Sequence, residues 1–283
     1  MALASGRRVL HAGCEVGLVM NRAGGAAVNS HRPYRVERVR RSRQVILDVL
    51  AGAARRYPVH ALVEFDVTVA ERRLRDGGGA VSWTGLVVAT VARAVAAHPE
   101  LNARRAGGRL LVFDRVDVAA TVERPVDGAL VPVVVAVRDA DRKSGQIITG
   151  ELRRVKTRPA PQPQRGPLSG LAVLPGPVRR RLLRLAGRSP AVAARFGPPV
   201  GVTSLGMFAA GGGWAIPIAP LTVTVTVGAV TPRAVVLDGR VVARSMLPLT
   251  VTFDHSVVDG APAARFTATF RNLTESAAAL EPG

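Results

Sequence analysis

Residues 221–227 alternate strictly between apolar side chains and threonine over seven positions. A period of two predicts a β-strand with one face toward a core. Residues 83–97 have a different pattern, because they are almost wholly apolar and follow Ser82, a residue type that caps helices. We expect a helix there that is buried. The two elements indicate a sizeable core, which an apolar fraction of 48% can supply.

The elements expected around these two alternate between helix and strand. Apolar residues recur every three or four positions between Val45 and Ala53, which predicts an amphipathic helix. Strands are expected at 61–69, 110–113, 116–122, 129–137, 234–237, 240–243 and 247–253. A polar-faced helix is expected at 144–156, and a last helix carries Phe266, Phe270 and Leu273 on one face. Asp238-Gly239 predicts a tight hairpin turn.

Two segments differ in composition from the rest. Residues 1–33 are rich in Gly, Ala, Arg and Ser without an apolar period, and we expect a disordered tail before a single domain at 34–279. Residues 157–200 hold nine prolines and form an insert rich in proline and arginine. Within it, residues 178–186 predict a short basic helix. It is interpreted as a solvated connector that packs its leucines on the domain, with a membrane-surface or partner-binding helix as the alternative.

The chain is strongly basic, with 39 Lys and Arg against 20 Asp and Glu and a formal charge of +19. Only two of the basic residues are lysines, and no motif combines aromatic with basic residues, so nucleic-acid binding is not favoured. A surface that attracts phosphates or an acidic carrier protein fits the charge better. Cys14 is the single cysteine and no two of the five histidines have metal-ligand spacing, so no metal is expected. No apolar run is long enough for a membrane span and no signal peptide is recognised, which predicts a cytoplasmic location.

One motif carries candidate chemistry: Asp254-His255-Ser256-Val257-Val258-Asp259-Gly260. A histidine that follows a predicted strand, in a turn and not on an apolar face, is placed to act as a general base. The aspartate four residues later can hold the turn by pairing with an arginine or by capping the last helix. The alternative is that Asp259 only caps the helix and His255 has no chemical role.

Residues 203–266 resemble the catalytic domain of the dihydrolipoamide acyltransferases, the core components of 2-oxo acid dehydrogenase complexes. That family has an Asp-His-Arg-Val-Val-Asp-Gly-Ala motif followed by Ala-Ala-Arg-Phe, and residues 254–261 and 263–266 match it except that Ser256 replaces the arginine. The family's Ser-Asn-Leu-Gly-Met-Phe is similar to residues 203–208. Further matches stand at 99–103, 130–133, 138–141, 216–218 and 246–249. The resemblance runs in order over about residues 36–275, interrupted by 157–200.

The resemblance implies an α/β (α+β) two-layer sandwich in which a mixed β-sheet is flanked by helices, as in chloramphenicol acetyltransferase. It also implies catalytic roles. His255 would take the proton of a thiol, which then attacks an acyl thioester. Thr203 would hydrogen-bond the oxyanion that forms, with Ser204 as the other candidate donor. Asp259 would be held by an arginine, for which Arg41 and Arg43 are the candidates. Gly206, Met207 and Gly260 are expected to bind substrate.

The resemblance further implies trimers with the active site between subunits, so that His255 faces Thr203 of a neighbour. We expect a stand-alone acyltransferase, because a lipoyl domain and a subunit-binding domain could not fit into residues 1–33. It would transfer an acyl group between coenzyme A and a lipoyl- or pantetheine-type thiol, with no covalently bound cofactor. The homotrimer, or a larger multiple of trimers, would use an acyl-carrier or lipoyl protein in trans. The alternative is a catalytically silent trimeric scaffold with the same fold.

Overall fold

The computed structural model describes residues 36, 39, 41–126, 129–157, 169–205 and 213–280. The chain divides into two units, residues 1–38 and 39–283, and every helix and strand described belongs to the second. The predicted disordered tail at 1–33 lies outside the described residues, as do residues 158–168 of the predicted insert. In chain order the elements are α1 (Arg41–Ala53), β1 (Pro58–Asp66), α2 (Thr68–Asp76), α3 (Trp83–Ala97), β2 (Ala103–Ala106), β3 (Arg109–Val112), β4 (Val118–Val126), β5 (Ala129–Val137), α4 (Gly145–Thr157), α5 (Gly176–Ala186), α6 (Pro190–Ala193), β6 (Val200–Ser204), β7 (Val223–Val227), β8 (Thr231–Leu237), β9 (Arg240–Asp254) and α7 (Gly260–Glu275).

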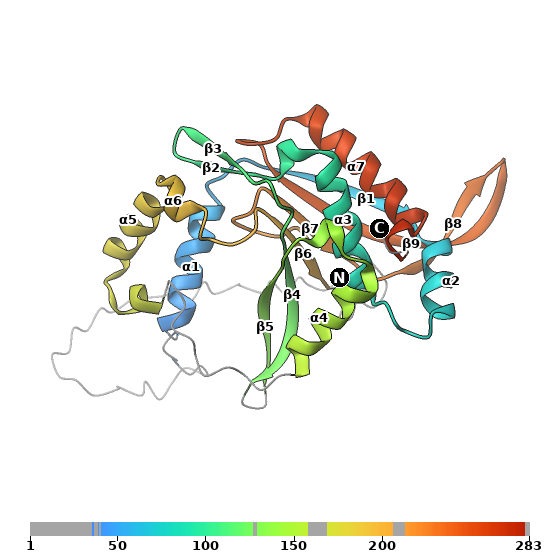
Figure 1. The fold of residues 1–283 in the computed structure, drawn as a ribbon, viewed down its shortest axis with the longest axis horizontal. Coiled ribbons are helices and arrows are strands. Elements are labelled where there is room, and N and C mark those ends of the chain that lie inside the picture. Colours follow the sequence, from blue (N-terminus) through green and yellow to red (C-terminus); the bar gives the residue numbers. More distant parts are fainter. Residues whose placement is uncertain are drawn as a thin grey trace, which may run out of the picture. The chain divides into compact units, whose positions relative to one another are not determined.

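The main sheet has the strand order β1-β9-β7-β6-β4-β5, and β8 pairs with the outer half of β9 (Figure 1). β6 runs parallel to both β4 and β7, and the other pairs in this sheet are antiparallel. A parallel pair needs a long crossover, and the chain between β4 and β6 supplies one through β5 and α4–α6. β2 and β3 form a separate hairpin. The predicted mixed sheet is therefore confirmed.

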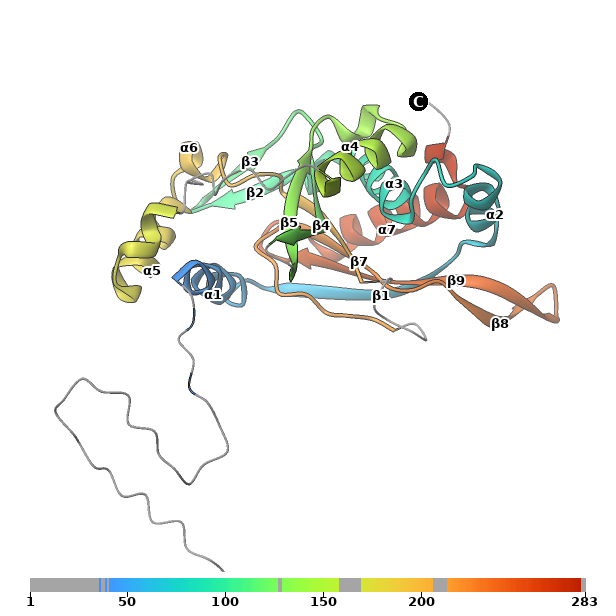
Figure 2. The same cartoon turned by 90° about the horizontal axis from the view of Figure 1, so that it is seen from below.

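Helices cover one face of the sheet, where α3 lies against β6 and β4 and α7 lies against β1 (Figure 2). Phe65, Phe266 and Phe270 fill the space between the two layers, and the rings of Phe65 and Phe270 meet edge to face at 5.1 Å. α4 packs on α3 at a point where both helices carry glycine. A Cβ on Gly85 would stand 2.1 Å from Thr149 Oγ1 and 2.8 Å from the carbonyl oxygen of Gly145. The predicted two-layer architecture is confirmed, with its core between the sheet and these helices.

Local signals located several elements closely. α3 spans the predicted residues, and Ser82 caps it by accepting a hydrogen bond from the Gly85 N–H at 3.1 Å. The hairpin turn at Asp238-Gly239 has two positive φ angles, 49° and 74°, as a two-residue turn requires. The basic helix predicted at 178–186 is α5.

Three predictions about strands were inaccurate. The strands predicted at 240–243 and 247–253 form one strand, β9, which spans Arg240–Asp254. The predicted strand at 61–69 ends at Asp66, because the Asp66 carboxylate accepts hydrogen bonds from the N–H and Oγ of Thr68 and α2 begins there. β7 was expected to bury one face only, yet all five of its residues are buried. It lies inside the sheet between β6 and β9, a position that the alternating pattern does not reveal.

Candidate active site

The His255 motif forms a tight turn at the end of β9. The carbonyl oxygen of Asp254 accepts hydrogen bonds from the N–H groups of Val257 and Val258, at 2.9 and 3.0 Å. The N–H of His255 donates to the carbonyl oxygen of Tyr57 at 2.8 Å, which ties the turn to the residue before β1. β1 and β9 pair directly up to Pro58 and Asp254, so the turn stands on a regular ladder.

A buried carboxylate holds this turn from within. The side chain of Asp254 is 2% exposed, and one of its oxygens accepts a hydrogen bond from Arg56 at 2.7 Å. The other oxygen accepts from the N–H and the Oγ of Ser256, at 3.0 and 2.7 Å. Charge-assisted bonds of this kind are stronger than neutral ones. Ser256 stands where the family motif has arginine. It follows His255 in the chain and donates both of these bonds to Asp254, which precedes His255.

The imidazole of His255 is half exposed and has a carboxylate beside it. Its Nδ1 lies 3.4 Å from Oδ1 of Asp259, whose side chain is 85% exposed. Asp259 occupies the N-cap position of α7 with an extended backbone, but its side chain makes no capping hydrogen bond. The carboxylate therefore stands beside the imidazole and does not cap the helix. Nδ1 is the ring nitrogen on the carboxylate side, which leaves Nε2 as the candidate to accept a proton. Gly260 follows as the first residue of α7.

The structure does not place Arg43 on Asp259. Arg43 is exposed on α1, and within the described residues the side chain beside the Asp259 carboxylate is that of His255. The side chain of Arg41 lies outside the described part. The arginine that does reach the motif is Arg56, because it stands two residues before Pro58 and the β1–β9 register sets Pro58 opposite Asp254. Sequence reasoning missed the pair of Arg56 and Asp254, because the strand was predicted to begin at residue 61 and Arg56 lies two residues before the observed start of β1 at Pro58.

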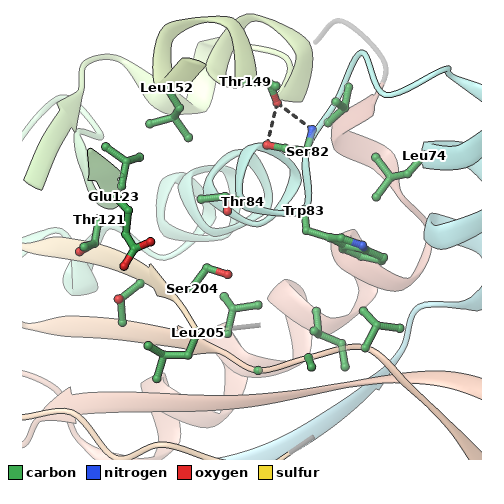
Figure 3. Close-up of a pocket in the computed structure, with 18 of the residues that line it drawn as sticks. Leu74, Ser82, Trp83, Thr84, Thr121, Glu123, Thr149, Leu152, Ser204 and Leu205 are labelled. Carbon is green, nitrogen blue, oxygen red and sulfur yellow. Dashed lines mark hydrogen bonds between the residues drawn. The ribbon is translucent and has the colours of Figure 1, made fainter. Parts of the chain in front are cut away.

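Thr203 and Ser204 lie at the end of β6 and line a cavity of about 1110 Å³ (Figure 3). Trp83, Glu123 and Leu205 border the same space in Figure 3. The two hydroxyls proposed to stabilise an oxyanion therefore face a volume that can admit a substrate. Gly206 and Met207, which were expected to bind substrate, lie outside the described residues.

His255 and Thr203 of one chain do not meet. The strand register sets Thr203 beside Thr226 and Thr226 beside Thr250. His255 lies five residues beyond Thr250 along β9, which is about 17 Å at the rise of an extended strand. His255 also does not line the Thr203 cavity. A single chain thus presents two halves of the predicted site at opposite ends of the same strands.

Outside this site, the described residues hold no cluster of three His, Cys, Asp or Glu that could bind a metal ion. Among the helices the structure describes, none combines the length and the apolarity needed to cross a membrane.

Residues 28–162 and 197–281 match the family model of the 2-oxoacid dehydrogenases acyltransferase (catalytic domain). The dihydrolipoyllysine-residue acetyltransferase component of the pyruvate dehydrogenase complex of Bacillus subtilis is 28% identical over 255 residues, covering 85% of this chain and 50% of that protein. The lipoamide acyltransferase component of a Pseudomonas putida branched-chain alpha-keto acid dehydrogenase complex is 42% identical over 86 residues, which are 30% of this chain and 20% of that one. The chain spans half or less of the length of these relatives.

Solved structures share the fold. A dihydrolipoamide acetyltransferase of Azotobacter vinelandii superposes with a TM-score of 0.66 at 22% identity, covering 92% of this chain and 99% of that one. Its study concerns the role of a serine, a histidine and an asparagine in the catalytic mechanism. The cubic core of a pyruvate dehydrogenase multienzyme complex superposes with the same TM-score and coverage. A probable dihydrolipoamide acetyltransferase of Listeria monocytogenes has a TM-score of 0.63 at 20% identity, covering 87% and 96%.

Proposed function

The chain belongs to the family of 2-oxoacid dehydrogenase acyltransferase catalytic domains, and we propose that it transfers an acyl group between two thiols. Coenzyme A would be one, and a lipoyl- or pantetheine-type arm the other. The observation that carries the proposal is the pair of His255 and Asp259, on a turn held by the buried carboxylate of Asp254. A turn held in this way gives the backbone of His255 a defined position, from which its imidazole can accept a proton.

In the proposed reaction, Nε2 of His255 removes the proton from the attacking thiol while Asp259 stabilises the imidazolium. The thiolate adds to the carbonyl carbon of the acyl thioester and forms a tetrahedral oxyanion. The hydroxyl of Thr203, or that of Ser204, donates a hydrogen bond to this oxyanion. The intermediate then collapses, the carbon–sulfur bond of the donor breaks, and the departing thiolate takes the proton back from His255.

The separation of about 17 Å along the strands supports a site in which His255 and Thr203 come from two subunits. We propose a cyclic trimer with one site at each interface. The A. vinelandii study supports the assignment of roles, because its serine precedes the histidine by 52 residues and its asparagine follows by four. Thr203 and Asp259 stand at those spacings from His255. Asp259 differs from the asparagine in having a carboxylate in place of an amide.

The test is an acyl-exchange assay on the purified chain, with a panel of acyl-coenzyme A donors and with dihydrolipoamide and pantetheine as acceptors. His255→Ala is expected to lower the transfer rate roughly 10²–10⁴-fold, the contribution of a general base. Thr203→Val keeps the shape but removes the hydroxyl, and should cost roughly 10²–10³-fold. His60→Gln serves as the control, because His60 bonds Thr252 on the same sheet without touching the turn. Full activity in His255→Ala would contradict the proposal.

Co-expression of the two inactive variants tests the shared site. At an interface that takes His255 from the Thr203→Val chain and Thr203 from the His255→Ala chain, both site residues are the wild-type ones. Random mixing in a ring produces such interfaces at about one position in four. We expect about a quarter of the wild-type rate to return. A mixture that stays silent would mean that each chain uses its own two residues, or that the chain is a scaffold without activity.

A further inference from the structure

A second cavity, of about 710 Å³, lies behind the His255 turn. Its walls come from α1, from the β2–β3 hairpin and from the segment that holds α5 and α6, and Asp254 and Ser256 line it at the turn. α1, α5 and α6 lie together at one end of the molecule in both views (Figures 1 and 2). The α5 segment falls in the part of the chain, residues 163–196, that the family match leaves out. This cavity is therefore built in part by residues that the family match does not account for.

The lining is strongly positive. Seven arginines line the cavity, against the carboxylates of Asp48 and Asp254. Both carboxylates are already paired: Asp48 with Arg179 and Arg180, and Asp254 with Arg56. Within the described residues, the other five arginines of the lining have no carboxylate partner. They are Arg55, Arg104, Arg105, Arg184 and Arg188.

One of these cations is buried. Arg104 is 4% exposed, and it donates to the carbonyl oxygens of Ala193 and Pro198, each at 2.8 Å. Burial, together with the charge of Arg56, lowers the pKa of Arg104 to about 10. Arginine is seldom buried without a carboxylate. These bonds hold α6 and the residues after it against β2, and they add a positive charge inside the wall that water screens little.

We propose that this cavity binds the clustered phosphate groups of a nucleotide-sized molecule. A guanidinium group can bind two phosphate oxygens at once with defined geometry, and several arginines line this cavity. The volume lies in the range of small-molecule sites. Tyr57 and Phe196 line the cavity with partly exposed rings, on which a flat base can stack. The inference does not depend on acyl transfer, because it concerns binding alone.

The binding test is calorimetry on the full chain with inorganic pyrophosphate and with adenosine 3′,5′-bisphosphate as probes. Arg184→Gln removes a cation of the lining, and Arg181→Gln is the matched control, since it removes an exposed cation of the same helix that does not line the cavity. We expect the dissociation constant for pyrophosphate to rise about tenfold in Arg184→Gln. It should change less than about twofold in Arg181→Gln. No binding to the wild-type chain at 1 mM pyrophosphate (roughly the weak limit for a specific site), or an equal loss in both variants, would overturn the proposal.

A second arm identifies the source of the phosphates. If they belong to the thioester donor, adenosine 3′,5′-bisphosphate should compete with acyl-coenzyme A, and Arg184→Gln should raise KM with kcat unchanged. If they belong to a separate nucleotide, the bisphosphate should still bind at saturating acyl-coenzyme A. Failure of the two proposals is distinguishable. A chain that binds pyrophosphate through Arg184 but transfers no acyl group contradicts the proposed function alone.

Discussion

Removal of Arg56 is the most direct test of how the His255 turn is held. In Arg56→Met the carboxylate of Asp254, 2% exposed, loses its cation but keeps the two bonds from Ser256. Breaking a buried ion pair from one side costs about 3–5 kcal/mol. Arg56 is 29% exposed, so water can replace part of the lost interaction. We therefore expect a loss of about 2–3 kcal/mol in the free energy of unfolding.

A double-mutant cycle separates the pair from its surroundings. Asp254→Asn keeps the shape of the side chain, and its amide oxygen can still accept a hydrogen bond from Ser256. It no longer offers Arg56 a negatively charged oxygen. We expect the double variant to lose less than the sum of the single losses, with a coupling of about 1–2 kcal/mol. The measurement is urea unfolding at one fixed protomer concentration, because association shifts apparent stability. Arg55→Met is the control, since Arg55 is an exposed neighbour without a carboxylate partner among the described residues, and should change stability by less than about 0.5 kcal/mol.

The same variants connect stability to the site. The His255 N–H bonds the carbonyl oxygen of Tyr57, the residue next to Arg56, so loosening Arg56 displaces the base. The acyl-transfer rate should fall more than tenfold in Arg56→Met (about 1.4 kcal/mol of barrier). A coupling below about 0.5 kcal/mol, or equal losses of stability in Arg56→Met and Arg55→Met, would refute the idea that this pair holds the turn.

Two further predictions concern other parts of the fold. Gly85→Ala should destabilise the chain by about 2–3 kcal/mol in chemical unfolding, because the new Cβ would meet Thr149 Oγ1 at 2.1 Å and overpack α3 against α4. Gly150→Ala, on α4 with nothing within 4 Å of its Cβ, should stabilise by about 0.5–1 kcal/mol, and a similar loss in both variants would contradict the packing argument. Burial raises the pKa of Asp66, but the hydrogen bonds from Thr68 and Arg244 outweigh it and hold that pKa below the ordinary 3.8. The resulting stabilisation is present above the unfolded-state pKa and lost as the pH falls through the folded-state pKa. Asp66→Asn should therefore be less stable than wild type at pH 7 and converge with it in acid, and a stability difference independent of pH would contradict this account.

Much of the local structure followed from short-range signals. The limits of α3 and its Ser82 cap, the Asp238-Gly239 turn and the helix α5 each depend on residues within a few positions of one another. Backbone sterics and helix capping act over that distance, so a single sequence reveals them. The His255 motif was recognisable for the same reason, since its residues are contiguous and its turn leads straight into a helix. The order of motifs along the chain supported the family resemblance, and that resemblance predicted the mixed sheet and its helical layer.

The contacts that complete the sites join residues that are far apart in the sequence. Arg56 and Asp254 are 198 residues apart in sequence, and only the β1–β9 register brings them together. The separation of Thr203 from His255 likewise depends on how β6, β7 and β9 are aligned. The arginine-lined cavity needs α1, a hairpin and α5 side by side, three elements whose own sequences say nothing of one another. Sequence alone determined which residues could do chemistry, through patterns that backbone geometry imposes locally. Tertiary structure decided which of them meet, because long-range pairing is selected by burial and register over the whole core.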